Sequence, residues 1–146
     1  MSVLQYICTF SRNEFTVYDI ISQISLEWKN EMSNSISGIE LSNILKKKFE
    51  NFSLIKGNII KTLPKFIKNN KNLKISLLHL DLDVFDATLF SLKNLYDKIV
   101  KNGIILLDDY GIESGATKAV DSFFAKKKKD IIKLKYHDHC SFIIKK

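Results

Sequence analysis

The sequence has few of the residues that break or cross-link a chain. It contains one proline, five glycines and two cysteines, Cys8 and Cys140, in 146 residues. These counts exclude collagen-like and Pro/Gly-rich linker proteins, a dense disulfide framework and a four-cysteine zinc site. With 45% hydrophobic and 27% charged residues, the chain has enough apolar material for one folded domain and too little length for two.

Long apolar runs are also absent. No stretch reaches the roughly 18 apolar residues of a membrane span, and the N-terminus lacks a basic start before an apolar segment. We therefore expect a soluble, cytoplasmic protein with reduced thiols and no membrane partner.

Arginine is nearly absent although the formal net charge is +7, because Arg12 is the only arginine among 23 basic residues. Proteins that read nucleic-acid sequence depend on arginine for bidentate contacts, so the charge alone does not predict a nucleic-acid partner. The lysine runs at 46–48 and 126–129 fall where helices are predicted to end, which favours cations. A non-catalytic basic binding module remains an alternative, and its binding would weaken steeply with salt.

From about residue 39 onward, helical and extended patterns alternate, as is typical of an α/β sheet with crossover helices. Before that point the pattern predicts a strand at 3–10 and a helix at 15–28. Asp86 can cap one helix, and Asn102-Gly103 is expected to close it. The later predictions are helices at 40–49, 63–69, 86–101 and 116–127, strands at 52–56, 74–82 and 104–107, and an antiparallel hairpin from 131–136 and 140–144.

Carboxylates follow two neighbouring buried strands of the predicted sheet. Asp81 and Asp83 end the first strand, and Asp108 and Asp109 end the second. A right-handed crossover makes these strands parallel neighbours about 4.8 Å apart, so the four side chains should share one crevice at the edge where α/β sheets bind ligands. Crowded carboxylates raise one another's pKa unless a cation is bound, and oxygen ligands favour Mg²⁺ over Zn²⁺.

Three motifs carry a resemblance to a known family. They are LHLDLDVFDAT at 78–88, NGIILLDDYG at 102–111 and GATKAVD at 115–121, preceded by IKGNIIKTLP at 55–64. Together they resemble the macrocin O-methyltransferase family, whose members use S-adenosylmethionine to methylate sugar hydroxyls. The resemblance implies that 37–146 is the C-terminal part of a methyltransferase domain, and that 1–36 is a poorly matched segment.

The resemblance also implies roles for individual residues. Asp81, Asp108 and Asp109 correspond to the family's Mg²⁺ ligands, and Asp83 to the carboxylate proposed as its general base. Asn58 falls where related enzymes turn around the adenine of S-adenosylmethionine, although an ordinary turn asparagine is an equal alternative. The implied substrate is a sugar or glycoside whose hydroxyl loses its proton more readily beside a cation.

The chain departs from the family at its N-terminus. The family's first strand and Gly-rich cofactor loop have no match, since no glycine precedes Gly38. The expected fold is therefore a Rossmann-like class I methyltransferase sheet that is N-terminally incomplete, in a fragment or remnant of the enzyme. We expect a gap before the strand ending at Asp81, which the strand at 3–10 could partly fill, and an exposed edge there would favour a homo-oligomer.

Other interpretations stay open at this stage. The run Asp81-Leu82-Asp83-Val84 also fits the start of haloacid-dehalogenase-like phosphatases, although their second acidic pair lies much further along the chain. His79 is interpreted as a core histidine. Cys140 is interpreted as a small buried hydrophobic residue.

Overall fold

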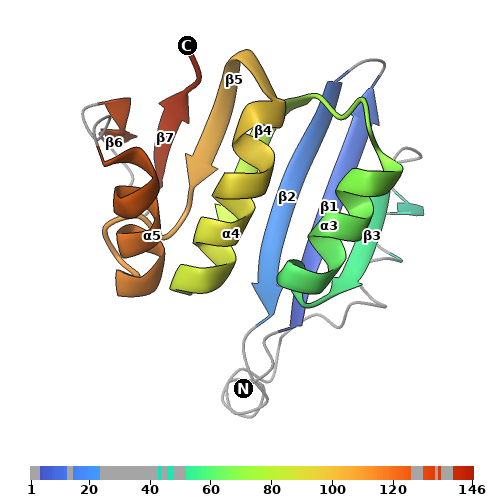
Figure 1. Ribbon diagram of the computed structural model, residues 1–146, viewed down its shortest axis with the longest axis horizontal. Coiled ribbons are helices and arrows are strands. Elements are labelled where there is room, and N and C mark those ends of the chain that lie inside the picture. The colour runs from blue at the N-terminus through green and yellow to red at the C-terminus, as the bar shows by residue number, and fades with distance from the viewer. Residues whose placement is uncertain are drawn as a thin grey trace.

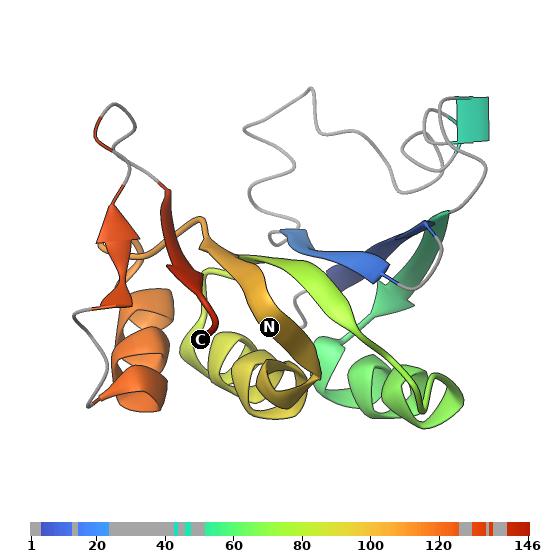
Figure 2. The same ribbon diagram turned by 90° about the horizontal axis from the view of Figure 1, so that it is seen from above.

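The computed structural model describes residues 4–12, 15–23, 43, 46–47, 52–125, 130–133, 135 and 140–146. These residues form a seven-stranded mixed sheet with three α-helices on one face (Figures 1 and 2). The elements are β1 Leu4–Arg12, β2 Phe15–Gln23, β3 Phe52–Gly57, α3 Ile59–Asn69, β4 Ile75–Asp81, α4 Phe85–Leu95, a 3₁₀ turn Tyr96–Lys98, β5 Ile99–Leu107, α5 Ser114–Phe124, β6 Ile132–Lys133 and β7 Ser141–Ile144.

The strand order is β3-β1-β2-β4-β5-β7-β6. Strands β2, β4 and β5 are parallel, whereas β1 is antiparallel to both of its neighbours and β7 is antiparallel to β5 and β6. This arrangement confirms the α/β fold class and the antiparallel C-terminal hairpin. None of the described helices is long and apolar enough to cross a membrane.

The expected gap in the sheet is filled. Strands β1 and β2 lie between β3 and β4, and β2 pairs in parallel with β4 from Thr16↔Ile75 to Ile21↔Asp81. The predicted strand at 3–10 is confirmed, but the predicted helix at 15–28 is wrong over Phe15–Gln23. This stretch is rich in β-branched and aromatic residues, and pairing on both edges decides its structure. Since the described strands leave no open edge between β3 and β4, the argument for a homo-oligomer from such an edge no longer holds.

The second difference concerns the end of α4. The helix was expected to reach residue 101 and to close at Asn102-Gly103, but α4 ends at Leu95 and β5 already begins at Ile99. Between paired positions β4 advances from Ile75 to Leu77 while β5 advances from Ile99 to Ile104. Asn102, with φ of 63°, lies in the resulting bulge, which exchanges two backbone hydrogen bonds with Lys145.

Lys145 secures this junction from the C-terminal end of the chain. Its Nζ donates to the carbonyls of Tyr96 at 2.9 Å and Ile99 at 2.7 Å. It also lies 4.9 Å from the centroid of the Tyr96 ring. Carbonyls at the end of a helical segment lack intrahelical donors, so the ammonium group satisfies them and stabilises the turn into β5.

The remaining predicted elements that the structure describes are confirmed within a few residues, except that α3 begins at Ile59 rather than near residue 63 and that β6 covers Ile132–Lys133 of the strand predicted at 131–136. Most of the predicted helix at 40–49 and the lysine run at 126–129 lie outside the described residues. Lys46 and Lys47 are exposed.

The core lies between the helices and one face of the sheet. Alternate residues of β4 and β5 point into it, and the opposite face of the sheet is more open, with Ile104 of β5 39% and Ile144 of β7 42% exposed. At the carboxyl end of β4 the last two residues lie on opposite faces of the sheet: Leu80 is buried in the core, whereas Asp81 lies on the more open face. The core includes Leu63, Leu78, Leu80, Leu92, Ile105, Leu107, Val120 and Phe124.

Candidate functional site

The carboxyl ends of four strands meet at one edge of the sheet. Strand β3 runs in the same direction as β2, because both are antiparallel to β1, and β4 and β5 continue that direction. Asn58 follows β3, Asp81 ends β4, and Asp108 and Asp109 follow β5. This is the edge at which open α/β sheets bind their ligands.

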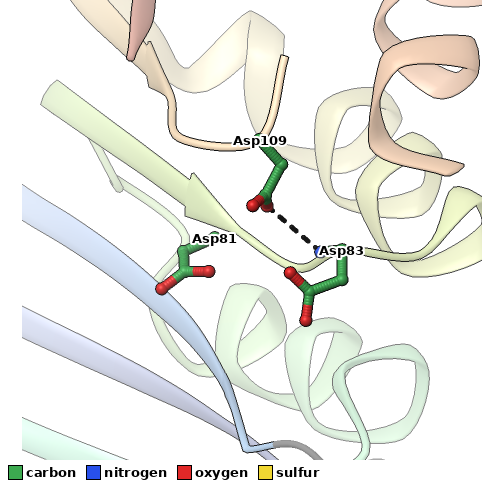
Figure 3. Close-up of side chains that lie close together, drawn as sticks. All are labelled: Asp81, Asp83 and Asp109. Carbon is green, nitrogen blue, oxygen red and sulfur yellow. Dashed lines mark hydrogen bonds between the residues drawn. The ribbon is translucent and has the colours of Figure 1, made fainter. Parts of the chain in front are cut away.

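Three carboxylates converge at the ends of β4 and β5 (Figure 3). Asp81, Asp83 and Asp109 each offer one oxygen atom, and these atoms lie within 4.8 Å of one another. All three side chains are partly buried. Such a group of oxygen ligands fits a hard divalent cation, which the sequence predicted at this edge.

The backbone around Asp83 holds its side chain in this group. Asp83 has φ of 53°, an uncommon conformation for a residue other than glycine. Its N–H donates to Asp109 Oδ2 at 3.2 Å, and its carbonyl accepts from the N–H of Ala116, in the first turn of α5, at 3.0 Å. The Val84 N–H also donates to the Leu82 carbonyl across Asp83. The acidic residue is therefore placed by contacts from two other segments.

A glycine allows α5 to approach this loop. A Cβ atom at Gly115 would lie 2.8 Å from the Asp83 carbonyl oxygen and 2.9 Å from the Phe85 nitrogen. Both neighbours are backbone atoms, so no side-chain movement could make room for it. Gly115 was part of the sequence motif at 115–121, but its packing role could not be read from the sequence alone.

Two of the crowded carboxylates, Asp81 and Asp109, hold their protons more tightly than isolated ones. Burial, followed by the charges of Asp109, Asp108 and Asp83, raises the pKa of Asp81 from 3.8 to about 7, against the charge of His79, which lowers it. Burial also raises the pKa of Asp109, against the hydrogen bond from the Asp83 backbone, which lowers it. A divalent cation would offset this repulsion, so the electrostatics of the group agree with its donor chemistry.

Asp108 takes a different position from the other predicted ligands. Its Oδ1 accepts a hydrogen bond from the Cys140 thiol at 3.0 Å and lies 3.5 Å from His79 Nε2. The structure thus brings Asp81, Asp83 and Asp109 together and turns Asp108 towards β7. Burial, followed by the hydrogen bond to Asp108, raises the pKa of Cys140 to about 11, which keeps the thiol protonated at neutral pH.

Asn58 has a structural role at the other end of this edge. Its Oδ1 accepts from the Ile60 N–H at 3.0 Å and caps α3, and its carbonyl accepts from the N–H groups of Lys61 and Thr62. Strands β1 and β2 separate β3 from β4, which places Asn58 roughly 14 Å from the carboxylates by strand spacing. A ligand that contacts both Asn58 and the carboxylates would have to extend across the ends of β1 and β2.

We expect Asn58→Ala to lower the free energy of unfolding by about 1 kcal/mol, because α3 would lose its side-chain cap. Asn58→Ser, which retains a capping oxygen, should lose only part of that stability. Urea unfolding of the three proteins measures the difference. An alanine variant as stable as the wild type would contradict the capping role.

Comparisons with known proteins agree with the motifs. The family model described as Macrocin-O-methyltransferase (TylF) matches residues 33–140. The structure of CalS11, a calicheamicin methyltransferase, is similar to this chain with 19% sequence identity and a TM-score of 0.56. The match covers 60% of this chain and 35% of the CalS11 chain. The apo structure of CalS11, described as a TDP-rhamnose 3'-O-methyltransferase, has 18% identity and a TM-score of 0.57, with coverages of 62% and 39%.

The O-methyltransferase NovP has 27% identity and a TM-score of 0.45, with 49% of this chain covering 30% of that one. No curated protein gives a significant match. The chain spans about a third of the length of these structures. The CalS11 structures share its fold, and the family model covers well over half of its residues, including all four aspartates. The chain belongs to the macrocin-O-methyltransferase family.

Proposed function

We propose that this chain carries the cation and acceptor part of an S-adenosylmethionine-dependent sugar O-methyltransferase site. The observation that supports it is the convergence of Asp81, Asp83 and Asp109 at the carboxyl ends of β4 and β5. Family membership favours this function over the phosphatase and basic-module alternatives. The proposed acceptor is a nucleotide-linked sugar, because CalS11 is described as a TDP-rhamnose 3'-O-methyltransferase.

The proposed roles follow from the geometry and the family motif. Asp81 and Asp109 hold Mg²⁺, together with Asp108 by the resemblance, although its Oδ1 contacts Cys140 in this structure. When bound, the cation lowers the pKa of a coordinated sugar hydroxyl. Asp83 then accepts the hydroxyl proton as general base, since its carboxylate lies within 4.8 Å of the other two.

In the proposed reaction the methyl group passes directly from S-adenosylmethionine to the sugar oxygen, with no covalent enzyme intermediate. The sugar oxygen forms a bond to the methyl carbon while the carbon–sulfur bond of the sulfonium breaks, and the electron pair stays on sulfur. The proton resides on Asp83. The residues of the site contribute by holding the acceptor in line, because correct orientation supplies a large part of the rate. Asn58 is proposed to contact the adenosine end of S-adenosylmethionine at the far end of the edge.

The test is methyl transfer from S-adenosylmethionine to a panel of nucleotide-linked deoxysugars, beginning with TDP-rhamnose, with Mg²⁺ or with a chelator. We expect activity that needs Mg²⁺, and we expect Asp83→Asn to lower kcat about 100-fold or more. Calorimetry should show that this variant still binds Mg²⁺. The matched control is Asp86→Asn, which replaces an exposed aspartate in α4 outside the acidic group.

Two results would contradict the proposal. One is an Asp83→Asn variant that transfers methyl groups as fast as the wild type does. The other is a wild-type chain that binds neither Mg²⁺ nor S-adenosylmethionine in calorimetry while it unfolds cooperatively.

A further inference from the structure

Strand β6 brings a lysine to the same edge of the sheet as the acidic group. Strands β5 and β6 are both antiparallel to β7, so they run in the same direction and their carboxyl ends lie at one edge (Figure 1). The last residue of β6 is Lys133, which pairs with Ser141, and Ser141 pairs in turn with Leu107. Lys133 is therefore level with the last residue of β5, roughly 10 Å away by strand spacing.

The loop after β5 connects the acidic group with this lysine. A Cβ atom at Gly111 would lie 3.3 Å from Lys133 Nζ, so the ammonium group sits beside the backbone of Gly111. Gly111 has φ of 91°, which residues with a side chain rarely adopt, and its N–H donates to Thr117 Oγ1 at 2.8 Å. Since consecutive Cα atoms are about 3.8 Å apart, Gly111 lies within about 7.6 Å of Asp109. One short loop therefore separates the carboxylates from the ammonium group.

The ammonium group of Lys133 is accessible to an anionic ligand. The side chain is exposed, and none of the carboxylates in the described part of the chain forms an ion pair with it. The neighbouring acidic group suits a cation that can hold a hydroxyl. A ligand that carries a hydroxyl close to a phosphate would match both features of this part of the edge.

We propose that Lys133 binds the diphosphate of a nucleotide-linked acceptor sugar whose ring hydroxyl is held at the acidic group. The inference rests on the proposed function and adds to it a residue that selects a phosphorylated acceptor over a neutral glycoside. In such a sugar, four or five bonds of about 1.5 Å separate a hydroxyl on ring carbon 2 or 3 from the nearest phosphorus. The ligand is thus long enough to reach from the acidic group along the loop to Lys133, which binds phosphate as a point charge.

The strand order agrees with this arrangement. Asn58 follows β3 at one end of the sheet, Lys133 ends β6 at the other, and the acidic group lies between them. S-adenosylmethionine on the Asn58 side and the acceptor on the Lys133 side would therefore meet at the carboxylates. Neither ligand would have to cross the position of the other.

Calorimetry in the presence of Mg²⁺ measures the dissociation constants of TDP-rhamnose, TDP and methyl rhamnoside. We expect Lys133→Ala to weaken TDP-rhamnose binding about tenfold, as for the loss of one hydrogen bond between charged groups. Binding of the neutral rhamnoside should change less than about twofold, because it carries no phosphate for the lysine. Lys133→Arg keeps the charge and should stay within about threefold of the wild type for TDP-rhamnose. The matched control is Lys93→Ala, which replaces an exposed lysine in the last turn of α4, near the opposite edge of the sheet.

The role of Lys133 would be overturned if a folded Lys133→Ala variant bound TDP-rhamnose as tightly as the wild type, or if it lost affinity equally for TDP-rhamnose and methyl rhamnoside. A wild-type chain that does not bind TDP-rhamnose, or that binds TDP just as tightly, would also overturn it, because the sugar hydroxyl should add affinity through the cation. The proposed function fails in a different way. A chain that binds TDP-rhamnose through Lys133 but transfers no methyl group would contradict the proposed function and leave the role of Lys133 in place.

Discussion

The metal-free protein is expected to lose stability as the pH rises from about 4 to about 7. Asp81 has a pKa of about 7 in the folded chain, against an ordinary value of 3.8. In this pH window the folded state keeps a proton that the unfolded state releases, so the free energy of unfolding falls with rising pH. Below the window both states bind the proton, and above it neither does, so the contribution of Asp81 no longer changes.

Thermal unfolding at several pH values, with and without Mg²⁺, measures this effect. Asp81→Asn removes the titrating group, so the melting temperature of this variant should fall less between about pH 5 and about pH 8 than that of the wild type. Mg²⁺ should stabilise the wild type more at about pH 8 than at about pH 5, because the cation competes with the proton for the same carboxylate.

Asp97→Asn, which replaces an exposed aspartate in the 3₁₀ turn, is the matched control and should follow the wild-type curve. If Asp81→Asn and Asp97→Asn both keep the full pH dependence of the wild type, Asp81 does not hold a proton in the folded chain, and the electrostatic description of the site is wrong.

The second large effect is expected for Gly115→Ala. The added Cβ would lie 2.8 Å from the Asp83 carbonyl oxygen and 3.2 Å from Val84 Cα, so α5 must move away from the loop. The hydrogen bond from the Ala116 N–H to the Asp83 carbonyl would lengthen with it. Overpacking of this kind costs about 2 kcal/mol, which corresponds to a fall of roughly 4–8 °C in Tm for a chain of this size.

The same substitution should also weaken Mg²⁺ binding, because the acidic loop loses the contact that places Asp83. Calorimetry and thermal unfolding measure the two consequences separately. Lys118→Ala changes an exposed residue of the same helix and should affect neither. The close packing would be contradicted if Gly115→Ala matched this control in both measurements.

The position of the acidic group was largely predictable because its signal is local. Each pair of aspartates directly follows a buried apolar strand, and one crossover helix separates the strands, so parallel pairing brings Asp81 and Asp109 together. The orientation of Asp108 was not predictable. It depends on the register between β5 and Ser141–Ile144, which are far apart in the chain.

The middle of the sheet was the least predictable part of the fold. Apolar residues at Phe15, Tyr18 and Ile21 fit a helical repeat, but the same stretch pairs with β1 on one side and β4 on the other. Backbone pairing with distant strands outweighs such a short periodic pattern. The end of α4 was mispredicted for a related reason, since Asn102-Gly103 ends a helix in many sequences but forms a bulge here because Lys145 pairs with it.

The place of β1 and β2 in the sheet also bears on how the chain reaches its native state. These strands are adjacent in the chain and pair along their whole length, so little loop-closure entropy opposes their association. Their outer edges pair with distant residues, Gln5 with Gly57 and Thr16 with Ile75. Pairings between residues so far apart in the chain form slowly. The pairing of β1 with β3 and of β2 with β4 is therefore the rate-limiting part of folding.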